Sequence, residues 1–185
     1  MEVFNTEQTL RPQIDPVKEG VKIGLINGAI GLLLMYGSYY AGLDTFVNVQ
    51  FASKFIPYMM IILIIYGFQL RRRNGGYLPF RDALKYSFMS YVVVAVLMAI
   101  GTYILFNLID KNLTQKAFDL SLEKIKSTFS GMGMNEEDIE RTMGKREAQK
   151  TDFATIFLGT GFGLIWDFIV SLLVSLIIRR EKPVI

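Results

Sequence analysis

The sequence contains no cysteine and no histidine in its 185 residues. Without cysteine there are no disulfide bonds and no thiolate nucleophiles, and without histidine there is no imidazole general base. The two absences together also remove nearly all zinc and haem ligand sets. No spacing of the remaining residues indicates a carboxylate metal site or a Ser-Lys pair, so we expect no catalytic, cofactor or metal site and no enzymatic activity.

The chain also has little net charge and no basic face. Its formal net charge is +3 and its isoelectric point is near 9.0, and its aromatic residues belong to apolar stretches, so nothing predicts nucleic-acid binding. In contrast, 51% of the residues are hydrophobic, the mean hydropathy is +0.34, and the apolar residues are gathered in long runs. This distribution is typical of an integral membrane protein and not of a soluble domain.

Four apolar stretches predict transmembrane helices at about residues 22–43, 52–70, 85–109 and 153–178. A helix rises 1.5 Å per residue, so about 20 residues cross a hydrocarbon core of about 30 Å. The second stretch is the shortest, because its uncharged part covers Phe55 to Leu70. The predicted fold is therefore all-α, with residues 1–20 as a cytoplasmic tail and residues 21–185 as an integral membrane four-helix bundle.

Residues 110–152, between the third and fourth spans, are predicted to form an extracytoplasmic amphipathic helical hairpin. From about Thr114 to Phe129, apolar residues recur on one helical face with Lys and Glu between them. Glycines then break the helix, and Asn135 followed by acidic residues is typical of an N-cap that opens a second helix. The apolar side chains can pack the two helices together, lie on the membrane or bind a partner. They are Phe118, Leu122, Ile125, Phe129, Ile139 and Met143.

Basic residues near the span ends predict the orientation of the chain. Three arginines close the second span and precede the turn signal Asn74-Gly75-Gly76, and more basic residues follow the turn and close the fourth span. Lys and Arg close to a span resist translocation, so both termini and this turn should be cytoplasmic. A second hypothesis, compatible with the first, is recognition of anionic lipid headgroups. The residues concerned are Arg71, Arg72, Arg73, Arg81, Lys85, Arg179 and Arg180.

Glycines recur at helical spacing around the first span and in the fourth. A stripe that carries only hydrogen on its surface lets a second backbone approach closely. We predict that spans one and four pack through these stripes, and the spacing does not tell whether they do so within one chain or between two. The residues are Gly20, Gly24, Gly28 and Gly31 for the first stripe and Gly159 and Gly163 for the second.

Asp167 lies near the middle of the fourth span. A carboxylate at that depth costs on the order of 2.5–3.5 kcal/mol on insertion scales, so it should be neutral, paired or next to water. Asn27, Ser38 and Ser90 are neutral side chains that could bond to it, which makes Asn27 a further intramembrane polar candidate. Either Asp167 makes a structural hydrogen bond to another helix or to a partner protein, or it belongs to an ion or proton site. We expect the neighbouring Trp166 to pack between helices.

Three short motifs resemble those of a known family. The first runs from Asn74-Gly75-Gly76-Tyr77-Leu78 to Phe80-Arg81-Asp82-Ala83-Leu84-Lys85, the second is Asp110-Lys111-Asn112, and the third is Gly133-Met134-Asn135-Glu136-Glu137-Asp138-Ile139-Glu140. They are similar to the domain-of-unknown-function 4199 family of four-span membrane proteins from the Bacteroidota, and the likeness covers about residues 17–181. The resemblance implies four spans in a bacterial inner membrane, and it implies no activity.

Two functional hypotheses follow from these features. The first is a non-catalytic accessory or scaffold subunit in the lipid bilayer, which uses its glycine-lined spans and its hairpin to contact a membrane-protein partner. The second is a small transporter or channel component built around Asp167, which could assemble as a homo-oligomer.

Overall fold

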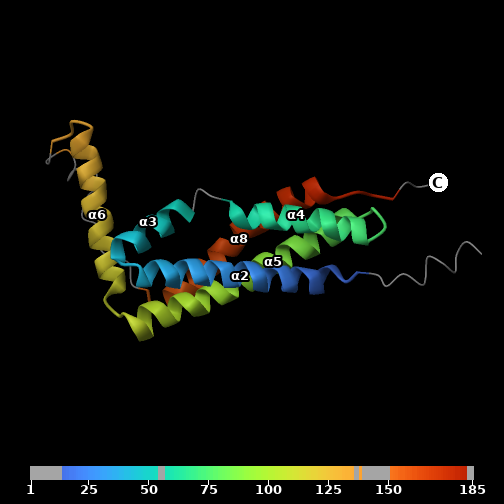
Figure 1. Cartoon of the computed structure of the whole chain (residues 1–185), viewed down its shortest axis with the longest axis horizontal. Coiled ribbons are helices and arrows are strands. Elements are labelled where there is room, and N and C mark those ends of the chain that lie inside the picture. The colour runs from blue at the N-terminus through green and yellow to red at the C-terminus, as the bar shows by residue number, and fades with distance from the viewer. Residues whose placement is uncertain (1–13, 54–56, 136–137, 139–150, 183–185) are drawn as a thin grey trace, which may run out of the picture. The chain divides into compact units, whose positions relative to one another are not determined.

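The computed structural model describes residues 14–53, 57–135, 138 and 151–182. The helices of this part of the chain confirm the predicted all-α fold (Figure 1). In order they are α2 (Pro16–Tyr40), α3 (Leu43–Ser53), α4 (Tyr58–Arg73), α5 (Phe80–Tyr103), a π-helix (Ile104–Ile109) that continues α5, α6 (Leu113–Gly131) and α8 (Phe153–Ile178).

Three helices are long and apolar enough to cross a membrane: α2, α5 together with the π-helix, and α8. A fourth crossing requires α3 and α4 to act together as one broken span. The 16 residues of α4 rise only about 24 Å by themselves, less than a typical hydrocarbon core. The described residues therefore contain three or four candidate spans, as a membrane protein would, and the fourth span stays a prediction.

The helices form two compact units. Unit 1 comprises Met1–Gly28, Pro57–Ala95 and Phe162–Ile185, and unit 2 comprises Ala29–Ile56 and Val96–Gly161. Three long helices, α2, α5 and α8, each contribute residues to both units. Each unit has its own apolar core, so each can be described by itself.

Helix α2 begins inside the predicted tail of residues 1–20. The Asp15 carboxylate accepts hydrogen bonds from the backbone N–H groups of Val17 (2.9 Å) and Lys18 (3.3 Å). Asp15 thus caps the helix, and Pro16 occupies the first helical position, where its missing N–H costs nothing. Helix α2 therefore starts at Pro16, within the residues predicted as a tail.

The core of unit 1 holds α2, α4, α5 and α8 together. It contains Leu63 and Leu70 of α4, Tyr86 of α5 and Ile178 of α8, all fully buried. The Tyr86 hydroxyl donates to the Leu63 carbonyl oxygen at 3.0 Å, so the phenol keeps a hydrogen bond inside the core. Gly67 leaves room for Ile178, whose Cδ1 would lie 2.7 Å from a Cβ atom at position 67.

Within unit 1, the glycines of the first span contact α5, and the pairing of spans one and four, which could also form between two chains, stays a prediction. A Cβ atom on Gly20 would lie 2.5 Å from the Tyr86 carbonyl oxygen, and one on Gly24 would lie 2.8 Å from that of Ser90. Gly28 and Gly31 continue the stripe and are also buried. In contrast, a Cβ atom on Gly159 or Gly163 would meet nothing within 4 Å. Spacing identified a contact surface on α2 but could not identify the helix that covers it.

The turn between α4 and α5 confirms the predicted glycine turn, since Gly75 and Gly76 have positive φ angles of 73° and 89°. It is also joined to the end of α8. Leu78 and Arg180 exchange two backbone hydrogen bonds of 2.9 and 2.8 Å, and the Glu181 carboxylate accepts from the Phe80 N–H at 2.9 Å. We refer to this junction of residues 71–82 with residues 178–182 as the clip.

In unit 2, the segment between the first two predicted spans is helix α3, which lies beside α6 (Figure 1). The Lys124 ammonium of α6 binds the carboxylate of Asp44 and the side-chain oxygen of Asn48, both at 2.6 Å. Phe46 on the same helix is buried in the core of unit 2. The polar residues Asp44 and Asn48 therefore connect α3 to α6.

The first hairpin helix forms as predicted, as α6. Its residues Phe118, Leu122, Ile125 and Phe129 are half-buried. The Asn135 side chain accepts a hydrogen bond from the Asp138 N–H at 2.9 Å, which is the predicted capping contact. Ile139 and Met143 lie outside the described residues, so the hairpin and its role in partner binding stay predictions.

Candidate functional site

Unit 1 contains a seam of polar side chains inside its membrane helices. Helix α2 contributes one of them, α5 two and α8 two, and each has no exposed surface. They are Asn27, Ser87, Ser90, Ser171 and Ser175. Buried polar groups in a membrane protein are costly unless they are hydrogen-bonded, so each of these side chains requires a partner.

Three of the five, Ser87, Ser171 and Ser175, are hydrogen-bonded to one another and join α5 to α8. The Ser87 hydroxyl lies 2.9 Å from the Ser175 hydroxyl. The carbonyl oxygens of Ala83 at 3.0 Å and Ser171 at 3.2 Å are alternative acceptors for its single proton. The Ser175 hydroxyl also donates to the Ser171 carbonyl oxygen at 2.5 Å. This part of the seam is satisfied, and its small side chains let the two helices lie close together.

The other two, Asn27 and Ser90, have no hydrogen-bond partner among the described residues. Ser90 lies against Gly24, and Asn27 follows Gly24 by one helical turn. A helical side chain leans toward the N-terminus of its helix, which brings the Asn27 amide to the level of Gly24. Both polar groups therefore belong to the interface of α2 with α5, where an internal water or a small cation would find oxygen ligands.

Asp167 lies on the face of α8 that carries Ser171 one turn later and Ser175 two turns later. Its backbone carbonyl accepts from the Ser171 hydroxyl at 2.7 Å, but no described side chain hydrogen-bonds or ion-pairs with its carboxylate. Of the predicted partners, Ser38 donates to the Met35 carbonyl oxygen of its own helix, and Asn27 and Ser90 remain unpaired.

Beside Asp167, α8 presents an open surface formed by Phe162, Gly163 and Trp166. Phe162 is 73% exposed and Trp166 is 67% exposed. Trp166 therefore does not pack between helices of its own chain, contrary to expectation. We call these three residues with Asp167 the open face of α8.

A charged cluster at the clip end of unit 1 was not predicted. The Arg73 guanidinium lies 2.6 Å from the Glu19 carboxylate of α2 and donates to the Tyr66 hydroxyl at 3.2 Å. The Tyr66 hydroxyl in turn donates to Glu19. Glu19 seemed part of a polar tail, and only the helix that begins at Pro16 turns its side chain toward α4.

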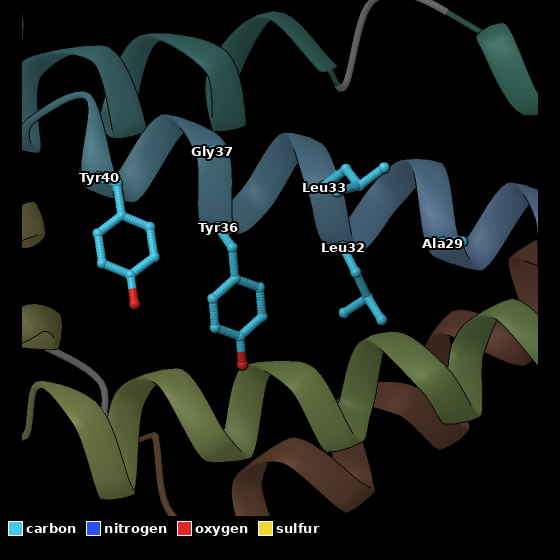
Figure 2. A pocket seen from close by; sticks show the side chains of 6 residues that line it. All are labelled: Ala29, Leu32, Leu33, Tyr36, Gly37 and Tyr40. Carbon is cyan, nitrogen blue, oxygen red and sulfur yellow. The ribbon is translucent and has the colours of Figure 1, made fainter.

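Unit 2 has an open apolar groove of about 550 Å³ along α2. Figure 2 shows Tyr36 reaching from α2 toward α5, where its hydroxyl donates to the Gly101 carbonyl oxygen at 2.9 Å. The groove offers few polar atoms to orient a ligand, so it suits lipid chains better than a polar substrate. Its lining residues are Ala29, Leu32, Leu33, Tyr36, Gly37 and Tyr40.

A smaller pocket of about 330 Å³ in unit 2 includes an ion pair outside the membrane helices. The Lys116 ammonium lies 3.0 Å from the Asp110 carboxylate. This hydrogen bond, with that of the Asn112 N–H, holds the pKa of Asp110 below its ordinary value. The pair fixes the start of α6 and provides no group poised for proton transfer.

Comparison with known proteins identifies a family. The family model described as a protein of unknown function, DUF4199, matches residues 22–180. The chain belongs to this family. The DUF4199 match covers most of α2 and all of the other long helices, including the seam, the open face of α8 and most of the clip. No curated protein and no solved structure gives a match.

Proposed function

We propose that this protein is a non-catalytic accessory subunit that binds a membrane-protein partner through the open face of α8. It lies in a bacterial inner membrane with both termini in the cytoplasm. The partner supplies a transmembrane helix with a hydrogen-bond donor at the depth of Asp167. The observation that carries the proposal is the Asp167 carboxyl group, which has no partner among the described residues of its own chain.

The energy of an intramembrane acid favours a partner. Its insertion costs on the order of 2.5–3.5 kcal/mol, and the nearby serines of α8 already use their hydroxyl groups on backbone carbonyls. A donor from a second helix offsets part of this cost, by about 1–2 kcal/mol per interhelical hydrogen bond. Lipid tails have no hydrogen-bond donor, so contact with lipid does not reduce the free-energy cost of inserting Asp167.

The shape of the open face also fits a second helix. Gly163 has empty space where a side chain would begin, which lets another backbone approach α8 closely. Phe162 and Trp166 on the same helix have large exposed rings, and aromatic side chains are enriched at the centres of protein interfaces. The absence of histidine and cysteine agrees with a role in assembly and not in catalysis.

Two substitutions at position 167 test the proposal. The tagged chain is purified from native membranes in mild detergent, and co-purifying proteins are quantified by native mass spectrometry. We expect a stoichiometric partner with the wild type, retention of that partner by Asp167→Asn, whose amide still forms hydrogen bonds, and a loss of roughly 5- to 30-fold in affinity for Asp167→Ala. Equal partner recovery with all three proteins rules the proposal out.

A second candidate function is transport of a proton or a small cation. Its specific support is the unpartnered pair Asn27 and Ser90, buried in the same unit as Asp167. In proteoliposomes this function requires ion flux that Asp167→Asn abolishes while the chain stays folded. A homo-oligomer without another partner, together with such flux, would favour transport over the accessory role.

A further inference from the structure

The clip assembles a basic surface from two distant parts of the sequence. The Leu78–Arg180 backbone pair and the bond from the Phe80 N–H to Glu181 hold the end of α8 against the turn between α4 and α5. The Arg71 guanidinium adds a hydrogen bond to the Ile178 carbonyl oxygen at 3.3 Å. Arginines from both segments therefore share one end of unit 1.

Most cations of this surface have no carboxylate partner. The acids nearby are already engaged, because Glu19 binds Arg73 and Asp82 lies 3.8 Å from Lys85, while Glu181 accepts from a backbone N–H. Four exposed basic residues of the clip form no ion pair with any described residue. They are Arg72, Arg81, Arg179 and Lys182.

We propose that this surface binds the phosphate headgroup of an anionic phospholipid. The surface lies where α4 ends, α5 begins and α8 ends, which is the level at which membrane helices meet the headgroups. Basic residues next to membrane helices attract anionic lipids, by about 1 kcal/mol each. Arginine suits the role because its guanidinium forms paired hydrogen bonds to phosphate oxygens.

The proposal assigns different tasks to neighbouring arginines. Arg73 is held by Glu19 and Tyr66, and Arg71 lies 4.9 Å over the Phe68 ring while it binds the end of α8. Arg180 lies 5.8 Å from the centre of the Tyr77 ring. These three residues build the clip, and the four exposed cations without an ion pair to described residues remain to bind a ligand, Arg72 and Arg179 among them. This distinction makes a selective test possible.

The test measures lipid binding by the full chain in detergent with native mass spectrometry. Phosphatidylglycerol is compared with phosphatidylcholine of the same acyl chains, and inorganic phosphate is added in a third series. The variant is Arg72→Gln/Arg179→Gln. Its matched control is Lys111→Gln/Lys126→Gln, which removes two exposed cations of unit 2 that form no ion pair with described residues.

We expect the wild type and the control to retain phosphatidylglycerol in preference to phosphatidylcholine, and the arginine variant to bind it roughly 30-fold more weakly. Equal retention by the variant and the wild type, or equal binding of the two lipids, overturns the proposal. Competition by inorganic phosphate at the concentration of the lipid also overturns it, because the site would then recognise free phosphate. If the variant does not fold, the wild type alone provides the test, because added salt weakens binding between charged groups. Wild-type binding that is unaffected by added salt then overturns the proposal.

Discussion

Alanine at position 24 should destabilise the protein by about 1–3 kcal/mol, the usual cost of adding a methyl group where a close-packed interface has no room. The new Cβ atom would lie 2.8 Å from the Ser90 carbonyl oxygen and 2.8 Å from the Val93 Cβ. The first of these is a backbone atom, so relief requires α2 to move away from α5. The expected result is a lower midpoint of thermal unfolding in detergent, followed by circular dichroism.

Gly159→Ala is the matched control, because it adds the same methyl group where nothing lies within 4 Å. Glycine in a helix is less stable than alanine by about 1 kcal/mol, so this variant should unfold at the same temperature as the wild type or slightly higher. Equal destabilisation by the two substitutions would mean that α2 and α5 are not in close contact at Gly24.

Arg73→Gln should destabilise unit 1, whereas Arg72→Gln should not. Removal of the Arg73 guanidinium takes away the ion pair to Glu19, whose side chain is 16% exposed. The Glu19 carboxylate then keeps only the hydrogen bond from Tyr66 among these two partners. Hydrogen bonds to charged groups are worth about 1.5–3 kcal/mol, but Arg73 itself is half exposed, so solvent screening reduces the expected loss to about 1–2 kcal/mol.

Thermal unfolding of the two variants in the same detergent measures this difference. Arg72 is the fair comparison, because it carries the same charge in the same helical turn and has no ion pair among the described residues. If both variants unfold at the wild-type temperature, the Glu19–Tyr66–Arg73 cluster contributes nothing to stability. If both are equally destabilised, the two arginines act through general charge and not through specific contacts.

Local chemistry predicted the elements whose cause lies within a few residues. The turn at Gly75 and Gly76 follows from the conformational freedom of glycine, and the Asn135 cap follows from its side chain. The long apolar helices follow from hydropathy alone. In each case no distant part of the chain is needed to explain the structure.

The elements that sequence reasoning missed depend on distant partners. Helix α3 was not predicted, because Asp44 and Asn48 are polar. Both bind Lys124, which lies far along the chain. Glu19 looks like part of a tail until Arg73 of α4 is placed beside it.

The candidate site shows the same limit. Asp167 was predicted from its depth in an apolar run, but its lack of a hydrogen-bond partner depends on three-dimensional placement. Asn27 and Ser90 were considered as its partners, and the side chains of both are instead buried without a hydrogen bond to any described residue. Residue type can indicate that a polar group is out of place in a membrane, and only the structure indicates whether its own chain satisfies it.

The open face of α8 is tested most directly by a photo-reactive amino acid at Phe162 in living cells, with Ile61 as control. Ile61 is also exposed in unit 1 but lies on α4, away from the open face in sequence and helix. The account predicts a protein cross-link at position 162, lost in Asp167→Ala, and only lipid adducts at position 61. Lipid adducts alone at both positions, or a cross-link that Asp167→Ala leaves unchanged, would contradict it.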